Sequence, residues 1–141
     1  MPSSQPLRRA AFLSVLAVVA STAIVLVALA VASGAQPRPG SGTSYDTEFV
    51  DMAVLHLSWL LAPLLGVTAF FSARVALLGV AGVAISQFLA MAETVHRYDE
   101  SEWSDGLQVL GYLFPIAVTA CCLGSVAIGW LVGRRRPVQD Q

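Results

Sequence analysis

The amino-acid sequence predicts an all-α fold, a polytopic four-transmembrane-helix bundle with both termini in the cytoplasm. Three observations lead to this prediction. The chain has 141 residues, 56% hydrophobic and 12% charged, and a mean hydropathy of +0.70, whereas soluble domains carry about 25% charged residues. Four apolar runs are long enough to cross a hydrocarbon layer about 30 Å thick. Most basic residues lie in the two terminal segments and in the short turn between the second and third runs, whereas most acidic residues lie in or beside the other two connections.

The whole chain, residues 1–141, is expected to form a single membrane domain. The four predicted spans are residues 11–32, 52–71, 75–92 and 107–132, and the two predicted outer loops are residues 33–51 and 93–106. The first span exceeds the 7–15 apolar residues of a secretory signal, so we expect an uncleaved anchor. The Ala-Leu-Ala and Ala-Val-Ala sequences near its end resemble a signal-peptidase site, so cleavage of this span is the alternative.

The arginines predict the orientation, because basic residues favour the cytoplasmic side of a membrane. All arginines except Arg38 and Arg97 lie before the first span, in the turn Ser72-Ala73-Arg74 or after the last span. All acidic residues except Asp140 lie in or beside the other two connections. We therefore expect both termini and the turn on the cytoplasmic side of the cell membrane.

Small residues occur at helical spacing along three of the spans. The first span carries Ser14, Ala17, Ser21, Ala28 and Ala32, the third carries Gly79, Gly82, Ser86 and Ala90, and the last ends in the GxxxG pair Gly129 and Gly133. Faces of this kind allow membrane helices to approach closely. Gln87 is the one strongly polar side chain well inside the third span, and we expect it to hydrogen-bond to a neighbouring helix. Pro63 is expected to kink the second span.

The two histidines are the strongest candidates for chemistry. The hairpin of the second and third spans brings His56 and His96 toward the same membrane face. With Met52, Met91 and Glu93 they form a candidate metal set, because imidazole and thioether ligands suit copper and two imidazoles can hold a haem. The same histidines could instead exchange protons. An interfacial His96 and a His56 that is hydrogen-bonded to a neighbouring helix, with no ligand at either, remain the alternative.

The remaining polar residues give less support to chemistry. Cys121 and Cys122 are adjacent rather than in a CxxC pattern, so we interpret them as small packing residues. The first span has no carboxylate, which disfavours a transporter that exchanges protons at a buried acid.

By elimination we expect a non-enzymatic accessory subunit that is embedded in the lipid bilayer. We expect it to bind a protein partner or to form a homo-oligomer. A metal, haem or proton site at the histidines is the first alternative, and a small oligomeric transporter or pore is the second. No cofactor is expected outside the histidine alternative, and no nucleic-acid partner is expected.

Overall fold

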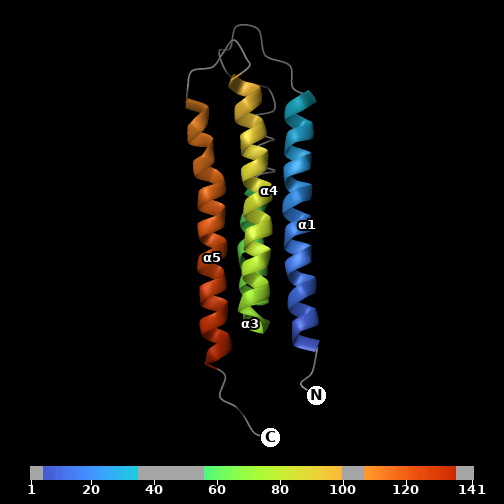
Figure 1. The fold of residues 1–141 in the computed structure, drawn as a ribbon, viewed down its shortest axis with the longest axis vertical. Helices are drawn as coiled ribbons and strands as arrows, with labels where there is room; N and C mark the ends of the chain where they lie inside the picture. Colours follow the sequence, from blue (N-terminus) through green and yellow to red (C-terminus); the bar gives the residue numbers. More distant parts are fainter. Residues whose placement is uncertain (1–4, 35–55, 100–106, 136–141) are drawn as a thin grey trace, which may run out of the picture.

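The computed structural model of the chain describes residues 5–34, 56–99 and 107–135, and these residues are almost entirely helical, which confirms the all-α prediction for them (Figure 1). The α-helices are α1 (Gln5–Gly34), α3 (Leu61–Phe71), α4 (Ala73–Asp99) and α5 (Leu113–Arg134). Two 3₁₀ helices, η1 (Leu57–Leu60) and η2 (Leu107–Tyr112), lead directly into α3 and α5.

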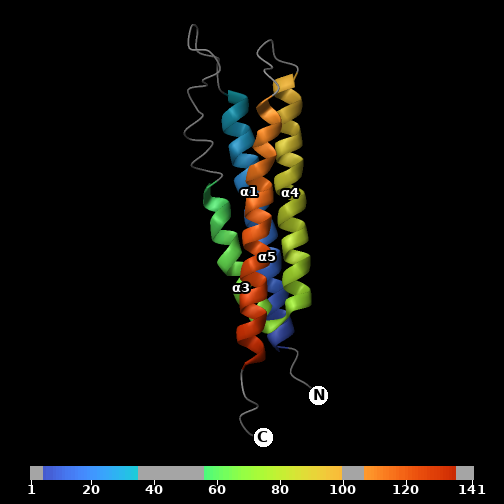
Figure 2. The same cartoon turned by 90° about the vertical axis from the view of Figure 1, so that its left-hand side faces the viewer.

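The helices run side by side as an elongated bundle (Figures 1 and 2). α3 and α4 contact each other, and each of them also contacts both α1 and α5. Among the described residues α1 and α5 share no contact, so they lie on opposite flanks of the central pair. The first residues of α1, the α3–α4 connection and the last residues of α5 lie at the same end (Figure 1).

Three helices are long and apolar enough to cross a membrane, which indicates a membrane protein. They cover Gln5–Ala30, Ala73–His96 and Leu110–Arg134. The apolar helix Leu57–Phe71 is shorter, and the first residues of the predicted second span, 52–55, lie outside the described residues. α4 continues to Asp99, so the first seven residues of the predicted outer loop 93–106 are helical.

The connection between α3 and α4 is tighter than the predicted three-residue turn. Ser72 alone separates the two helices and is extended, with φ −159° and ψ 107°. Its N–H donates to the Thr68 carbonyl at 2.9 Å, and its carbonyl accepts from the Ala76 N–H at 3.0 Å. Both helix ends thus keep a backbone partner, and Ala73 and Arg74 belong to the first turn of α4.

The two prolines of the spans occupy the same position in their helices. Pro63 is the third residue of α3 and Pro115 is the third residue of α5, and each helix follows a 3₁₀ segment. N–H groups in the first turn of an α-helix have no intrahelical acceptor, so proline removes no α-helical hydrogen bond there. The chain changes from 3₁₀ to α-helix just before Pro63, and the expected kink there stays a prediction.

The small-residue faces of α1 and α4 pack against each other, as such faces are expected to do. The Ser14 hydroxyl donates to the Val75 carbonyl at 2.8 Å. A Cβ on Gly79 would lie 2.9 Å from the Ser14 Oγ. A larger side chain at this position would push the two helices apart.

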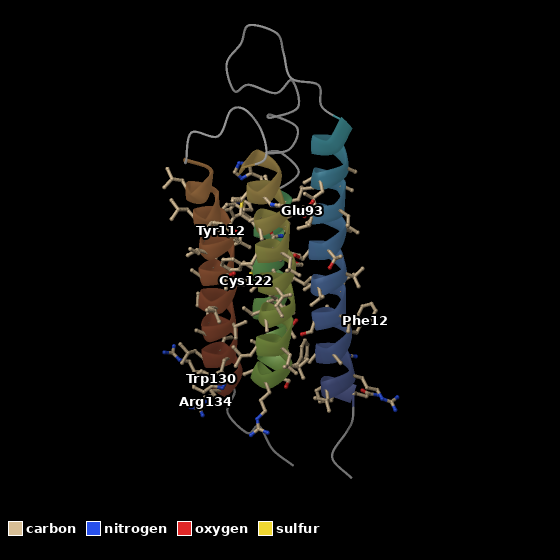
Figure 3. All side chains as sticks on the ribbon, turned by 45° about the horizontal axis from the view of Figure 1, so that its top comes forward. Phe12, Glu93, Tyr112, Cys122, Trp130 and Arg134 are labelled. Carbon is tan, nitrogen blue, oxygen red and sulfur yellow. The ribbon has the colours of Figure 1, made fainter. Side chains whose placement is uncertain are left out.

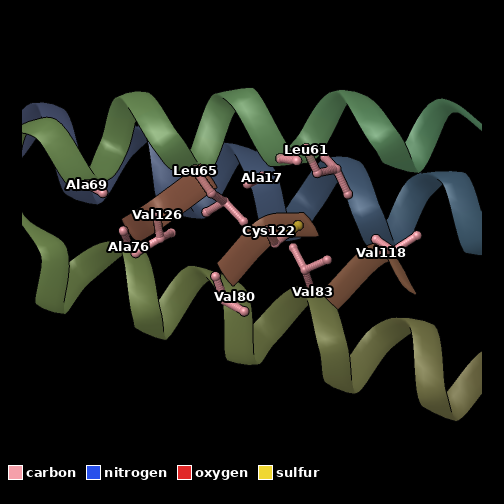
Figure 4. Packing of buried hydrophobic residues seen from close by; sticks show 11 residues of the cluster. Ala17, Leu61, Leu65, Ala69, Ala76, Val80, Val83, Val118, Cys122 and Val126 are labelled. Carbon is pink, nitrogen blue, oxygen red and sulfur yellow. The ribbon is translucent and has the colours of Figure 1, made fainter. Parts of the chain in front are cut away.

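The GxxxG pair of α5 packs against α3 within the same chain. A Cβ on Gly129 would overlap the Gly66 carbonyl oxygen, and one on Gly133 would lie 3.1 Å from the Phe70 carbonyl oxygen. Farther along the bundle the apolar core gathers side chains of all four α-helices, including Ala17, Leu65, Val83 and Cys122 (Figure 4).

Candidate functional site

His56 lies immediately before η1 and is held by aromatic neighbours. The indole Nε1–H of Trp59 donates to the His56 Nδ1 at 3.1 Å. The Phe114 ring meets the imidazole edge-to-face at a centroid distance of 6.3 Å, and meets the Trp59 ring in the same way at 5.9 Å. This small aromatic group joins η1 to the first turn of α5.

The Trp59 contact works against metal binding by His56. A metal at Nδ1 would displace the indole N–H, because both would need the same lone pair. A metal at Nε2 would require the imidazole proton at Nδ1, where it would face the indole donor. His56 is thus hydrogen-bonded within its own segment, whereas the alternative expectation was a hydrogen bond to a neighbouring helix.

The structure places His96 at a different level of the bundle from His56. His96 is an exposed residue of α4, nine residues beyond Gln87. The Gln87 amide touches Ser58, which is two residues after His56. With a rise of about 1.5 Å per α-helical and 2.0 Å per 3₁₀ residue, the backbone positions of the two histidines are roughly 10 Å apart along the axis.

The other described members of the candidate metal set, Met91 and Glu93, belong to the same end of α4 as His96. Met91 packs toward η2, where a Cβ on Gly111 would lie 2.8 Å from its Sδ. Glu93 is exposed on the upper part of α4 (Figure 3), and Met52 lies outside the described residues. Within residues 5–34, 56–99 and 107–135, no group of three His, Cys, Asp or Glu side chains could hold a metal. The metal site stays a prediction.

The most developed polar arrangement inside the bundle is the Gln87 cluster, formed by Ser21 of α1, Ser58 of η1, and Ser86 and Gln87 of α4. The Gln87 side chain is 3% exposed, and Ser21 and Ser58 are fully buried. The Gln87 Nε2 donates to the Ser21 Oγ at 3.1 Å and to the Ser58 Oγ at 3.0 Å. The expected interhelical hydrogen bond of Gln87 is thus present, and it joins three elements rather than two.

The hydrogen bonds of the Gln87 cluster have a direction. The Ser86 hydroxyl donates to the Val83 carbonyl at 2.8 Å, so in the 2.6 Å contact between the two hydroxyls the donor is Ser21. Protons therefore point from Gln87 to Ser21, then to Ser86 and to the α4 backbone. Both amide hydrogens of Gln87 are used, which gives the cluster a structural rather than a catalytic character.

The two adjacent cysteines of α5 have different surroundings. Cys122 is fully buried in the core, as expected for a small packing residue. Cys121 is exposed on the outer side of the helix, which corrects the expectation that both would be packing residues of the bundle.

Cys121 belongs to a row of small exposed side chains, which we call the α5 stripe. Its members are Ala117, Ala120, Cys121, Gly124 and Ala127. A Cβ on Gly124 would meet nothing within 4 Å. Larger exposed side chains, Leu113 and Leu131, lie toward the two ends of the same face, and Ile128 lies beside the row. The sequence analysis missed it, although small residues recur there at helical spacing.

Comparisons of the chain with protein-family models, with characterised proteins and with solved structures give no match.

Proposed function

We propose that this protein is a four-span accessory subunit of the cell membrane that binds a transmembrane helix of a partner protein through the α5 stripe. In this proposal both termini lie in the cytoplasm, and residues 52–71 complete the fourth span. The observation that carries the proposal is a row of small side chains on the face of α5 that points away from the bundle.

Packing elsewhere in the chain supports this interpretation of the stripe. The small residues of α1 meet those of α4, and Gly129 meets α3. Small residues at membrane helix surfaces permit close backbone approach and recur at helix interfaces. The exposed face of α1 instead carries large apolar side chains such as Phe12, Val15 and Val19, which is typical of contact with lipid. The α5 stripe therefore resembles the internal interfaces more than this lipid-facing surface.

The charges support the proposed orientation. Arg8, Arg9, Arg74, Arg134 and Arg135 all belong to the end of the bundle where α1 begins and α5 finishes. The acidic residues within the described ranges, Glu93 and Asp99, belong to the opposite end of α4. This distribution along the helix axes agrees with the rule that positive charges remain in the cytoplasm.

Native mass spectrometry of the complex extracted from its own membranes tests the proposal. The wild-type chain is expected to carry a partner subunit, and Gly124→Leu is expected to lose it, because the leucine projects from the stripe and prevents close helix approach there, while a Cβ at this position meets nothing within 4 Å in the bundle. Ala81→Leu, on the exposed face of α4, is the matched control and is expected to retain the partner.

Three results of this experiment would contradict the proposal. A partner that survives Gly124→Leu would place the interface elsewhere. A homo-oligomer without any other subunit would favour the transporter or pore. A haem or copper mass that disappears in His56→Ala would favour the histidine site.

A further inference from the structure

A groove at the arginine-rich end of the bundle has a wholly apolar lining surface, and two arginines are among the residues that border it. It is open, has a volume of about 390 Å³ and lies between the first turns of α1 and the end of α3. Its lining residues are Arg8, Arg9, Phe12, Leu13 and Phe71. Phe12 projects from the lower part of α1 (Figure 3) and is 67% exposed. The groove is separate from the α5 stripe, and α1 does not touch α5 among the described residues.

The charge and the apolar surface of the groove are arranged along the helix axis. Phe12 follows Arg8 by one helical turn, or about 5–6 Å along α1. The arginines therefore lie at the end of the bundle, and the aromatic wall lies deeper along the helices. The acidic residues of the described ranges, Glu93 and Asp99, belong to the far end of α4, so no described acidic residue lies beside Arg8 and Arg9.

We propose that this groove binds an anionic phospholipid, with the phosphate at Arg8 and Arg9 and an acyl chain against Phe12, Leu13 and Phe71. Arginine suits phosphate because its planar guanidinium can donate two parallel hydrogen bonds. Basic residues beside a membrane span attract anionic lipid, but two charges alone bind weakly. The apolar groove supplies the second contribution, because it removes acyl-chain surface from contact with other lipids and orients the molecule. An amphipathic occupant with a negative head fits both parts.

The test uses the purified full-length chain in detergent, titrated with phosphatidylglycerol or phosphatidylcholine of identical acyl chains and followed by native mass spectrometry. We expect the first phosphatidylglycerol to bind at least tenfold more tightly than phosphatidylcholine. Arg8→Gln/Arg9→Gln is expected to weaken phosphatidylglycerol binding roughly thirtyfold. Arg134→Gln/Arg135→Gln, with the same loss of charge on α5, is expected to change it less than twofold.

Two further measurements separate a lipid site from a simple anion site. Leu13→Ser keeps both arginines, so reduced phosphatidylglycerol binding in this variant would show that the apolar wall contributes. Millimolar inorganic phosphate should not displace the lipid. Equal affinity for the two lipids, equal losses in the two arginine variants, unchanged binding in Leu13→Ser, or displacement by phosphate would each overturn the proposal. Circular dichroism confirms that every variant retains its helices.

Discussion

Gln87 shows how one polar side chain can organise a membrane helix bundle. Its amide joins α4 to Ser21 of α1 and to Ser58 of η1. A buried amide without partners in an apolar interior is costly, and here each of its hydrogens reaches a serine hydroxyl. Donor and acceptor positions therefore specify how α1, η1 and α4 align along the bundle axis.

Gln87→Leu is expected to destabilise the bundle by about 1–3 kcal/mol, because two interhelical hydrogen bonds disappear and the buried hydroxyls of Ser21 and Ser58 each lose a donor. Unfolding in mixed detergent micelles, followed by circular dichroism, measures the difference. Thr22→Val is the control, since Thr22 is exposed and bonds only to the Val18 carbonyl of its own helix. Equal losses of stability in the two variants would show that the Gln87 cluster has no special role.

At the residue scale, the sequence was sufficient to predict that Gln87 hydrogen-bonds to another helix, because an amide in the middle of an apolar span needs a partner. It could not identify Ser58, since that contact depends on the depth at which η1 lies beside α4. It also suggested a shared site for His56 and His96. In the structure His56 accepts a hydrogen bond from Trp59 and His96 lies farther along the axis, and the shared site stays a prediction.

Among the elements, α5 has two different faces built from small residues. The inner face carries Gly129, where α3 approaches so closely that a Cβ would overlap the Gly66 carbonyl oxygen. The outer face carries Gly124, where a Cβ would meet nothing within 4 Å. The same residue type thus allows internal packing on one side and offers an open surface on the other.

Gly129→Ala is expected to destabilise the bundle by about 1–3 kcal/mol, the usual range for overpacking. Gly124→Ala, the same change in the same helix, is expected to be neutral or slightly stabilising, because alanine is the better helix former. Thermal or detergent unfolding of the two purified variants gives the comparison. Similar effects of both substitutions would contradict the close approach of α3 and α5 at Gly129.

At the element scale, the GxxxG pair and the small faces of the first and third spans were correctly recognised as packing surfaces. Their partners could not be assigned, because spacing along one helix does not say which helix lies opposite. Gly129 and Gly133 could have paired with another protein, yet they pack against α3. The tight α3–α4 connection was predicted in kind, but Ser72 alone makes it.

The molecule as a whole is polarised along its long axis. Arg8, Arg74 and Arg134 mark one end of the bundle, and Glu93 and Asp99 belong to the other end of α4. At the first end the Arg134 guanidinium also stacks on the Trp130 ring, 3.9 Å from its centroid (Figure 3). An amphipathic aromatic ring with a cation above it suits the boundary between hydrocarbon and headgroups. This polarity is the basis of the proposed four-span topology.

Cysteine accessibility tests that topology most directly. In a background with Cys121→Ala and Cys122→Ala, single cysteines are placed in the α3–α4 connection by Ser72→Cys and in the predicted outer loop by Ser101→Cys. We predict that a membrane-impermeant maleimide labels the Ser101→Cys protein in intact cells, and labels the Ser72→Cys protein only after the membrane is opened. Labelling of the Ser72→Cys protein in intact cells, or protection of the Ser101→Cys protein there, would contradict the proposed orientation.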